Sequence, residues 1–256
     1  MFLMVTVNVL CCKISSMNDL QKNVLIFGAN GAIGGSLSTL YANAGASVFA
    51  VTRNPHVFEN SNIKNTVVNY DDDHAFESAM DSLFSEYVPD IIVVACGALC
   101  IGEKMPEKSV VDIDAQYMED LYRVNTILPT MIMKRVISRM PRDRDFKFAA
   151  LSARVGSISD NRLGGWYGYR ASKAALNMII KTASIEVRRK HKNSVIVGLH
   201  PGTVDSDLSK PFQNSVLDGK LFSSDQSAQY LFEVIENLTP ADSGKVFDWK
   251  GDIIEP

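Results

Sequence analysis

Short, uninterrupted apolar runs alternate with helical patterns along most of this chain. The runs include VLIF, VFAV and IIVV, and each is followed by a segment with the apolar spacing of an amphipathic helix. A strand that is apolar at every position is buried on both faces, whereas a strand with one solvated face alternates apolar and polar residues. The order therefore predicts an α/β fold in which a doubly wound parallel sheet carries helices on both faces, giving three layers.

This rhythm continues from residue 22 to the end without a linker, repeat or low-complexity stretch. A chain of 256 residues can build one large core, so we expect a single domain over 22–256. Residues 1–21 form an N-terminal extension of uncertain role. Its start is apolar but lacks the basic segment and cleavage site of a secretory signal, and it is too short to span a bilayer. An extra strand, a peripheral contact and a true start at Met17 are alternatives.

Charge and cysteine content exclude several classes of partner. The net charge is −3, without a long run of like charge, so we expect neither nucleic acid nor a membrane as a partner. The four cysteines form two close pairs, Cys11 with Cys12 and Cys96 with Cys100. Their spacing does not suggest a disulfide framework, which favours a reducing cytoplasm. No histidine is near either pair in the sequence, and we predict no metal site.

A glycine-rich loop follows the first apolar run. The stretch VLIFGANGAIGG places its glycines after a predicted strand and at the entrance of a predicted helix. Such glycines allow a tight turn, the approach of a pyrophosphate to backbone amides, and close packing of helix on strand. The sequence therefore predicts a dinucleotide site whose loop residues are Gly28, Asn30, Gly31, Ala32, Ile33 and Gly34.

The end of the second predicted strand distinguishes between the two nicotinamide dinucleotides. An acid there would accept hydrogen bonds from the free ribose of NAD, whereas an arginine can pair with the 2′-phosphate of NADP. The chain reads VFAVTRNP, with Arg53 and no acid, so we predict NADP (NADPH) as the preferred cofactor, with NAD as the alternative. Arg53 could also be a solvated surface residue. Asn69, at the end of the third predicted strand, is placed to meet the adenine, and Asp71 to Asp73 are expected to cap the next helix.

A tyrosine and a lysine open a later amphipathic helix, YGYRASKAAL. Tyr169 has Lys173 four residues on, the helical spacing that places two side chains on one face, whereas Tyr167 has no such partner. A phenol has a pKa near 10, and a neighbouring ammonium would lower it by favouring the phenolate. Tyr169 could then act as a general acid or base toward a carbonyl or an alcohol. An ordinary surface pair is the alternative interpretation.

With the glycine loop, the buried strands and Tyr169-x-x-x-Lys173 in this order, the chain resembles the short-chain dehydrogenase/reductase family over residues 22 to 250. The stretches GSISDNRLGGWYGYRASKAALN and MPEKS resemble its C-factor and sniffer-like carbonyl reductase branch. The resemblance implies a Rossmann-type fold, NAD(P)-dependent hydride transfer between NADPH and a small-molecule carbonyl or alcohol, and a homodimer or homotetramer. It also gives Lys173 a role in holding the nicotinamide ribose.

Three further motifs match the family in whole or in part. Asn125, in YRVNTILP, matches an asparagine that interrupts a helix and holds a water in the proton relay, although it could be an ordinary helix residue. Gly97, in VACGAL, retains the glycine of the family's N-N-A-G motif but not its asparagines. The stretch HPGTVDSDL matches P-G-x-V, which places near the cofactor Pro201, Gly202, Thr203, Val204 and Ser206, with turn formation as the alternative.

The family's substrate-orienting serine is missing. The chain reads LSARVGS, so Ala153 stands at that position. Ser152 and Ser157 are the nearest candidates for a catalytic hydroxyl. Ser152 would need the strand end to turn, because adjacent strand residues point to opposite faces, and Ser157 lies on the loop beyond Gly156. Capping or loop hydrogen bonding is an equal alternative for each serine.

The segment between Pro201 and Ala228 has the polar, irregular character of a substrate loop. Trp166, Phe212 and Leu217 are candidates to line an apolar pocket, although aromatic residues are more often packed in a core. The missing serine and the altered asparagine motif also support a rival hypothesis, a dinucleotide-binding regulatory or signalling protein with weak or no turnover. The retained tyrosine and lysine favour an enzyme.

Overall fold

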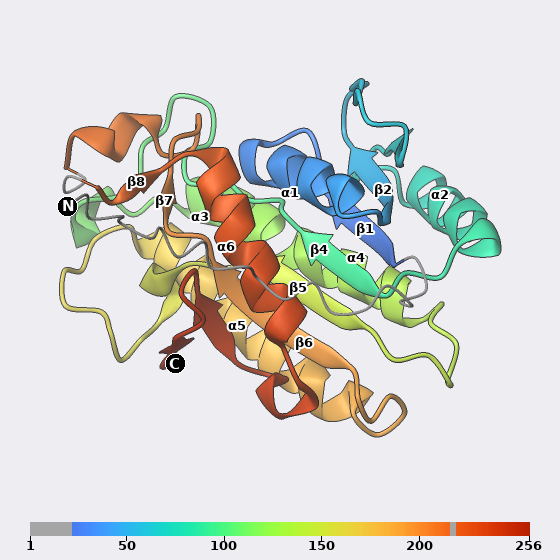
Figure 1. Ribbon diagram of the computed structural model, residues 1–256. Coiled ribbons are helices and arrows are strands. Elements are labelled where there is room, and N and C mark those ends of the chain that lie inside the picture. Colours follow the sequence, from blue (N-terminus) through green and yellow to red (C-terminus); the bar gives the residue numbers. More distant parts are fainter. Residues whose placement is uncertain (1–21, 216–218) are drawn as a thin grey trace, which may run out of the picture.

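The computed structural model describes residues 22–215 and 219–256 (Figure 1). Within these ranges an eight-stranded sheet has the order β10-β9-β6-β5-β4-β1-β2-β3. Its strands are β1 (Asn23–Phe27), β2 (Ser47–Thr52), β3 (Ile63–Val67), β4 (Ile91–Val94), β5 (Lys147–Leu151), β6 (Val195–His200), β9 (Val246–Asp248) and β10 (Ile253–Ile254). All neighbouring pairs are parallel except β9 and β10. The predicted doubly wound parallel sheet is confirmed.

The helices cover both faces of this sheet. They are α1 (Ala32–Asn43), α2 (Asp73–Glu86), α3 (Ala115–Tyr122), α4 (Leu128–Ile137), α5 (Tyr167–Val187) and α6 (Ser224–Asn237). Figure 1 shows α1 and α6 in front of the sheet, with α4 and α5 behind it. None of the helices in the described ranges has the length and hydropathy needed to cross a membrane.

The apolar runs form strands because both of their faces are covered. In β1, Val24 and Ile26 pack into one core with residues of α1 and α6. The intervening Leu25 and Phe27 pack into a second core with residues of α2, α4 and α5. Successive side chains of a strand point to opposite faces, so a central strand needs apolar residues at every position.

The helix that Asn125 was expected to interrupt is divided into α3 and α4 in the structure. Between α3 and α4 the chain forms a π-helical turn of five residues, Arg123–Ile127. Such a turn widens the helix by one residue and often marks a functional site. Asn125 lies in its middle and is fully buried.

The segment between β3 and α2 agrees with the sequence-based expectations in part. Asp72 caps α2 by accepting a hydrogen bond from the Ala75 amide (2.9 Å), which confirms a capping role within the aspartate run. Asp71 and Asp73 instead pair with Arg123 and Arg135. β3 ends at Val67, so Asn69 follows the strand rather than ending it. At the other edge of the sheet, β10 pairs antiparallel with β9.

The strand order reverses at β1, whose neighbours are β2 on one side and β4 on the other. The crossovers leave in opposite directions from this point, so a crevice opens beyond the carboxyl ends of the strands. A two-stranded sheet of β7 (Thr203–Val204) and β8 (Leu221–Phe222) lies beyond the carboxyl end of β6. The N-terminal extension, residues 1–21, lies outside the described residues, as do Cys11 and Cys12.

Candidate active site

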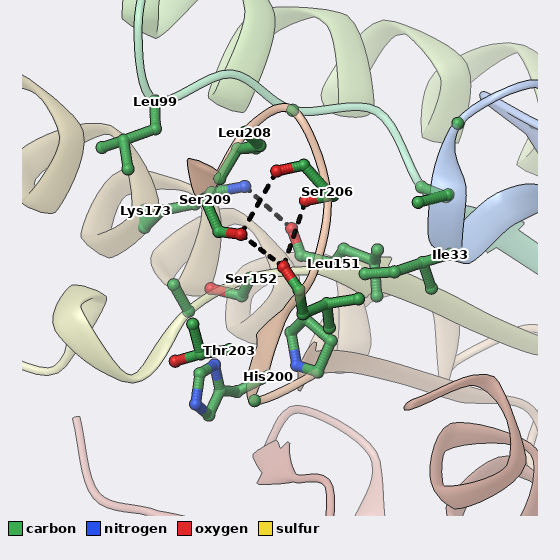
Figure 2. Close-up of a pocket in the computed structure, with 18 of the residues that line it drawn as sticks. Ile33, Leu99, Leu151, Ser152, Lys173, His200, Thr203, Ser206, Leu208 and Ser209 are labelled. Atoms are coloured by element: carbon green, nitrogen blue, oxygen red, sulfur yellow. Dashed lines mark hydrogen bonds between the residues drawn. The ribbon is translucent and has the colours of Figure 1, made fainter. Parts of the chain in front are cut away.

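A cavity of about 440 Å³ lies at the carboxyl ends of the central strands (Figure 2). Its walls come from the loops after β1 and β4, the end of β5, the start of α5 and the chain after β6. The predicted site residues that line it are Asn30, Gly31, Ala32, Ile33, Gly34, Gly97, Ser152, Tyr169, Lys173, Pro201, Gly202, Thr203, Val204 and Ser206. Gly28, Arg53, Asn69, Asn125 and Ser157 are outside this lining.

The glycine loop forms a close turn between β1 and α1. Gly28 has φ +75°, a backbone conformation that favours glycine. A Cβ atom on Gly34 would lie 2.3 Å from the Gly28 carbonyl oxygen, so only glycine fits where the helix meets the loop. Helix α1 begins after Gly31 without a side-chain cap. Its first amides and its dipole therefore form the type of cradle that binds a phosphate group.

Tyr169 and Lys173 come from the first turns of α5 and are both buried, at 7% and 3% exposure. The Lys173 ammonium donates a hydrogen bond to the Leu151 carbonyl (2.9 Å) and lies 5.9 Å from the centre of the Tyr169 ring. Figure 2 shows Lys173 reaching toward the end of β5. The predicted proximity of the two side chains is thus present in the folded chain.

The pKa of Tyr169 shifts opposite to the predicted direction. Burial raises the pKa of the phenol above its ordinary value of 10.0. Burial also lowers the pKa of Lys173 to about 8, with the nearby Cys96 thiol opposing this shift. Sequence reasoning considered the attraction of the ammonium but not the removal of both groups from water, which disfavours the charged form of each.

Asn125 fixes the loop after β4. Its side-chain oxygen accepts a hydrogen bond from the Ala98 amide (2.9 Å), and its amide nitrogen donates to the Ala98 carbonyl (2.8 Å). The amide nitrogen also lies 3.2 Å from the Ser172 hydroxyl. The π-helical turn thus brings the Asn125 side chain to the end of β4, where this chain lacks the asparagines of the N-N-A-G motif. Gly97 lies beside the Asn125 side chain. Its water-holding role stays a prediction.

The two candidate serines occupy different surroundings. Ser152 lines the cavity, and its hydroxyl donates to the Asn177 side-chain oxygen (2.6 Å). The Ser157 hydroxyl accepts a hydrogen bond from the Asp160 amide (3.1 Å) and stabilises the following loop. A serine hydroxyl has one proton to donate, so Ser152 in this arrangement cannot donate to a second acceptor. Ala153 itself lines the cavity.

Arg53 and Asn69, predicted to meet the 2′-phosphate and the adenine, lie outside the cavity lining. Arg53 is exposed directly after β2. Burial raises the pKa of the Tyr70 hydroxyl, and the Arg53 guanidinium opposes that shift, which places Arg53 near Tyr70. Tyr70 was not predicted as a site residue. The Asn69 side chain accepts a hydrogen bond from the Asp71 amide (3.1 Å) and so shapes the turn before α2.

The apolar part of the cavity lies next to Tyr169. Trp166 packs against Phe212 with ring centres 5.0 Å apart and the rings tilted by 59°, and it packs against Tyr169 in a T-shaped arrangement with ring centres 6.2 Å apart. Leu99 completes this wall. The predicted lining by Trp166 and Phe212 agrees with the structure, whereas Leu217 lies outside the described residues. Sequence reasoning missed Leu99, because a leucine after a strand carries no signal of its own.

Two polar residues at the cavity also escaped prediction. Arg154 follows β5 and forms an ion pair with Asp248 of β9 (2.9 Å). His200 ends β6, and its buried Nδ1 atom has no hydrogen-bond partner among the described residues. Burial lowers the pKa of His200 to about 4, Arg154 adds to this shift, and Asp248 opposes it. His200 is therefore neutral in the folded protein at neutral pH.

The depressed pKa of His200 makes stability depend on pH. In the unfolded chain His200 binds a proton below its ordinary pKa of 6.5, whereas in the folded protein it does so only below about 4. The free energy of unfolding should therefore decrease as the pH falls from about 6.5 to about 4. The decrease should be on the order of 1–3 kcal/mol, since one pKa unit corresponds to about 1.4 kcal/mol.

Urea unfolding across this pH range tests the expectation with two variants. His200→Leu should lose less stability than the parent chain between pH 6.5 and 4. His56→Ala removes an exposed histidine and should behave like the parent. If His200→Leu and the parent lose the same free energy, His200 is not the group responsible.

Metal binding finds no support in the described part of the chain. No group of histidine, cysteine, aspartate and glutamate side chains within it could hold a metal ion. Cys96 and Cys100 are both free thiols there. Cys96 instead packs near the Gly28 turn, with Sγ 3.1 Å from the position of a Cβ atom on Gly28.

Comparisons with known proteins place the chain among one family. The family model described as short chain dehydrogenase matches residues 22–216. C-signal from Myxococcus xanthus is 33% identical over 140 residues, covering 55% of this chain and 79% of that protein. An uncharacterised oxidoreductase from Schizosaccharomyces pombe is 24% identical over 257 residues, covering 93% of this chain and 99% of that protein.

Solved structures share the fold. Carbonyl reductase Sniffer of D. melanogaster has a TM-score of 0.77 at 20% identity, covering 93% of this chain and 100% of that one. An NADPH-bound carbonyl reductase from chicken fatty liver has a TM-score of 0.77 at 23% identity, covering 94% of this chain and 97% of that one. At these identities the likeness shows the fold.

Proposed function

The chain belongs to the short-chain dehydrogenase family, and from this premise we propose that it is an NADP(H)-dependent oxidoreductase that interconverts a carbonyl and an alcohol. One observation carries the proposal. Tyr169 and Lys173 line the same cavity as the glycine loop, so a proton donor and a nucleotide cradle face one space. The structural neighbours include proteins described as NADPH-bound or NADP-bound, which supports this choice of nucleotide.

The residues present fit the nucleotide. The close turn at Gly28 and Gly34 leaves the first amides of α1 open to a pyrophosphate. We assign the 2′-phosphate to Arg53, the ribose to Lys173, the adenine edge to Asn69, and the nicotinamide amide to the segment 201–206. When bound, NADPH supplies the hydride for the reaction.

Tyr169 is the proposed proton donor to the carbonyl oxygen. Burial keeps the Tyr169 phenol protonated at neutral pH, which is the form that a proton donor needs. The same burial makes the phenol a weaker acid, so we expect proton transfer to accompany the gain of negative charge on the carbonyl oxygen. A phenolate would remain after proton transfer, and the Lys173 ammonium, 5.9 Å from the centre of the Tyr169 ring, would stabilise it. The apolar wall of Leu99, Trp166 and Phe212 excludes water and would hold the apolar part of the substrate.

The orienting hydroxyl is the weakest match to the family. We propose Ser152 over Ser157 because Ser152 lines the cavity, but its proton is directed to Asn177. A rotation of the Ser152 hydroxyl would be needed before it could donate to a substrate oxygen. This departure keeps the rival hypothesis, a nucleotide-binding regulatory protein with little turnover, as the second candidate.

Arg53 should determine the preference between NADPH and NADH. Replacing it with alanine removes a guanidinium suited to the 2′-phosphate, and charge-assisted hydrogen bonds contribute about 1.5–3 kcal/mol each. We expect the Kd for NADPH to rise about 10–100-fold in Arg53→Ala, with the Kd for NADH within about threefold of the parent. Titration followed by nucleotide fluorescence measures both constants.

The matched control is Arg188→Ala, which removes an exposed arginine at the far end of α5. Its two Kd values should equal those of the parent. An equal loss of NADPH and NADH affinity in Arg53→Ala would contradict the assignment of Arg53 to the 2′-phosphate. A parent protein that prefers NADH would contradict the NADP preference itself.

The proposed activity is tested by mixing the parent protein and NADPH with a panel of apolar aldehydes and ketones. Oxidation of NADPH that depends on the carbonyl supports the oxidoreductase. Nucleotide binding without turnover across the panel supports the regulatory alternative, and no binding of either nucleotide contradicts both.

We further propose that residues 22–256 act as one domain in the cytoplasm and that the protein forms a homodimer or homotetramer. Several apolar side chains are exposed on the π-helical turn and on α5, namely Ile127 (53%), Met178 (66%) and Ile185 (55%). The π-helical turn bears Asn125 and α5 bears Tyr169, and from the resemblance to the family we propose that the copies pair through these helices. A second copy packed there would remove these side chains from water.

A further inference from the structure

A glutamate far from the reacting groups in sequence is buried against the start of α5. Glu107 lies on the loop that follows β4, and only 4% of its surface is exposed. Acidic side chains are seldom buried without a partner. Both carboxyl oxygens of Glu107 accept a hydrogen bond from the Gly168 amide, at 3.1 and 3.3 Å. The Glu107 backbone carbonyl also accepts one from the Trp166 amide, at 2.5 Å.

These contacts fill a gap at the start of α5. Its N-cap residue, Trp166, has a left-handed backbone with φ 53° and makes no side-chain cap hydrogen bond. The first amides of a helix need acceptors from outside the helix, and a carboxylate there is also favoured by the helix dipole. Glu107 supplies this cap from a residue 61 positions earlier in the chain.

The cap and the helix fit closely. A Cβ atom on Gly168 would lie 2.9 Å from a Glu107 carboxyl oxygen and 3.0 Å from Leu121 of α3. Gly168 therefore lets the carboxyl group approach the backbone. The next residue is Tyr169, so the Glu107 contact fixes the backbone immediately before the proposed proton donor. The same loop carries Leu99, which forms part of the cavity wall.

We propose that Glu107 is a positioning residue that holds the start of α5 so that the Tyr169 hydroxyl meets the substrate. The inference rests on the proposed function of Tyr169. It assigns Glu107 no contact with substrate or nucleotide, since the carboxyl group is outside the cavity lining. A displacement of about 1 Å in a reacting group can reduce turnover on the order of 100-fold, so a small shift of this turn has a large effect.

Three variants test the proposal. Glu107→Ala removes the acceptor and should lower kcat for carbonyl reduction about 10–100-fold, with the Kd for NADPH within about twofold of the parent. Glu107→Gln retains a side-chain oxygen that can accept the Gly168 hydrogen bond, and its kcat should stay within about threefold. Glu103→Ala, which changes an exposed glutamate on the same loop, should match the parent.

Hydrogen–deuterium exchange over residues 166–170 gives a readout that does not depend on activity. The Gly168 amide should exchange faster in Glu107→Ala and remain protected in Glu107→Gln. Unchanged exchange, an unchanged kcat in Glu107→Ala, or an equal loss in Glu107→Gln would each overturn the proposal. If Glu107 only stabilises the fold, Glu107→Ala should lower the melting temperature, and its kcat should not fall while the Kd for NADPH stays unchanged.

Two further comparisons make the result decisive. If Glu107→Ala does not fold, Glu107→Asp replaces it, since the shorter side chain withdraws the carboxyl group by one methylene. Glu107→Asp should lose about tenfold in kcat while Glu107→Gln does not, and full activity of Glu107→Asp overturns the inference. Tyr169→Phe is measured in parallel, because full activity in that variant would show that the proposed function fails, whatever Glu107 does.

Discussion

Tyr169→Phe is expected to lower kcat for carbonyl reduction by about 10²–10⁴-fold, the usual contribution of a general acid or base. The substitution removes only the phenolic hydroxyl, and the buried ring can keep its contacts with Leu99, Leu121 and Trp166. The Kd for NADPH should therefore remain within about threefold, and the melting temperature should change little. Steady-state kinetics and nucleotide titration together separate the loss of chemistry from a loss of binding.

The matched control is Tyr167→Phe, two residues earlier on the same helix. Tyr167 is 36% exposed and does not line the cavity. Its variant should retain the activity of the parent within about twofold. An unchanged kcat in Tyr169→Phe would remove the tyrosine from the proposed reaction. Equal losses in both variants would point to disturbance of the start of α5 instead of lost proton transfer.

Gly34→Ala should have the second large effect, on nucleotide binding and on stability together. The added Cβ atom would lie 2.3 Å from the oxygen and 2.9 Å from the carbon of the Gly28 carbonyl group. Both are backbone atoms, so α1 and the loop must move apart. We expect the free energy of unfolding to fall by about 1–3 kcal/mol, as for other overpacked sites, and the Kd for NADPH to rise at least about 100-fold.

Gly35→Ala is the control for this substitution. Its Cβ atom would meet the Ala29 carbonyl oxygen at 3.3 Å, a contact that a small shift relieves, and alanine is favoured over glycine within a helix. The Kd for NADPH in Gly35→Ala should remain within about threefold of the parent. If Gly34→Ala binds NADPH as tightly as Gly35→Ala does, the close turn is not what positions the nucleotide.

The sequence predicted the features that depend on local patterns. The apolar runs predicted the parallel sheet because burial on both faces leaves a signal in consecutive residues, as in β1 and β4. The Tyr169–Lys173 pair and the glycine loop are also local, and together they identified the family that the comparisons confirm. The roles of these residues in the reaction stay predictions.

Features that depend on distant contacts could not be predicted. Glu107 is an ordinary charged residue in the sequence, and only the fold brings it to Gly168. The Ser152 hydroxyl meets Asn177 across 25 positions of the chain, which decides where its proton points. The predicted direction of the Tyr169 pKa shift was wrong because burial raises this pKa. The extent of burial depends on packing across the whole fold, and the spacing of two residues along one helix does not reveal it.

The parallel pairing of the central strands also affects how the chain folds. β1 pairs with β4, and β6 with β9, across long stretches of chain, and a parallel pair cannot form through a tight turn. In the described ranges only β9 and β10 of the large sheet are joined as an antiparallel pair. Folding must therefore close long loops before its main contacts stabilise it, which slows the process. A ribosome must synthesise residues 246–248 before β6 gains its second neighbour, and until then that edge of the sheet is open to other chains.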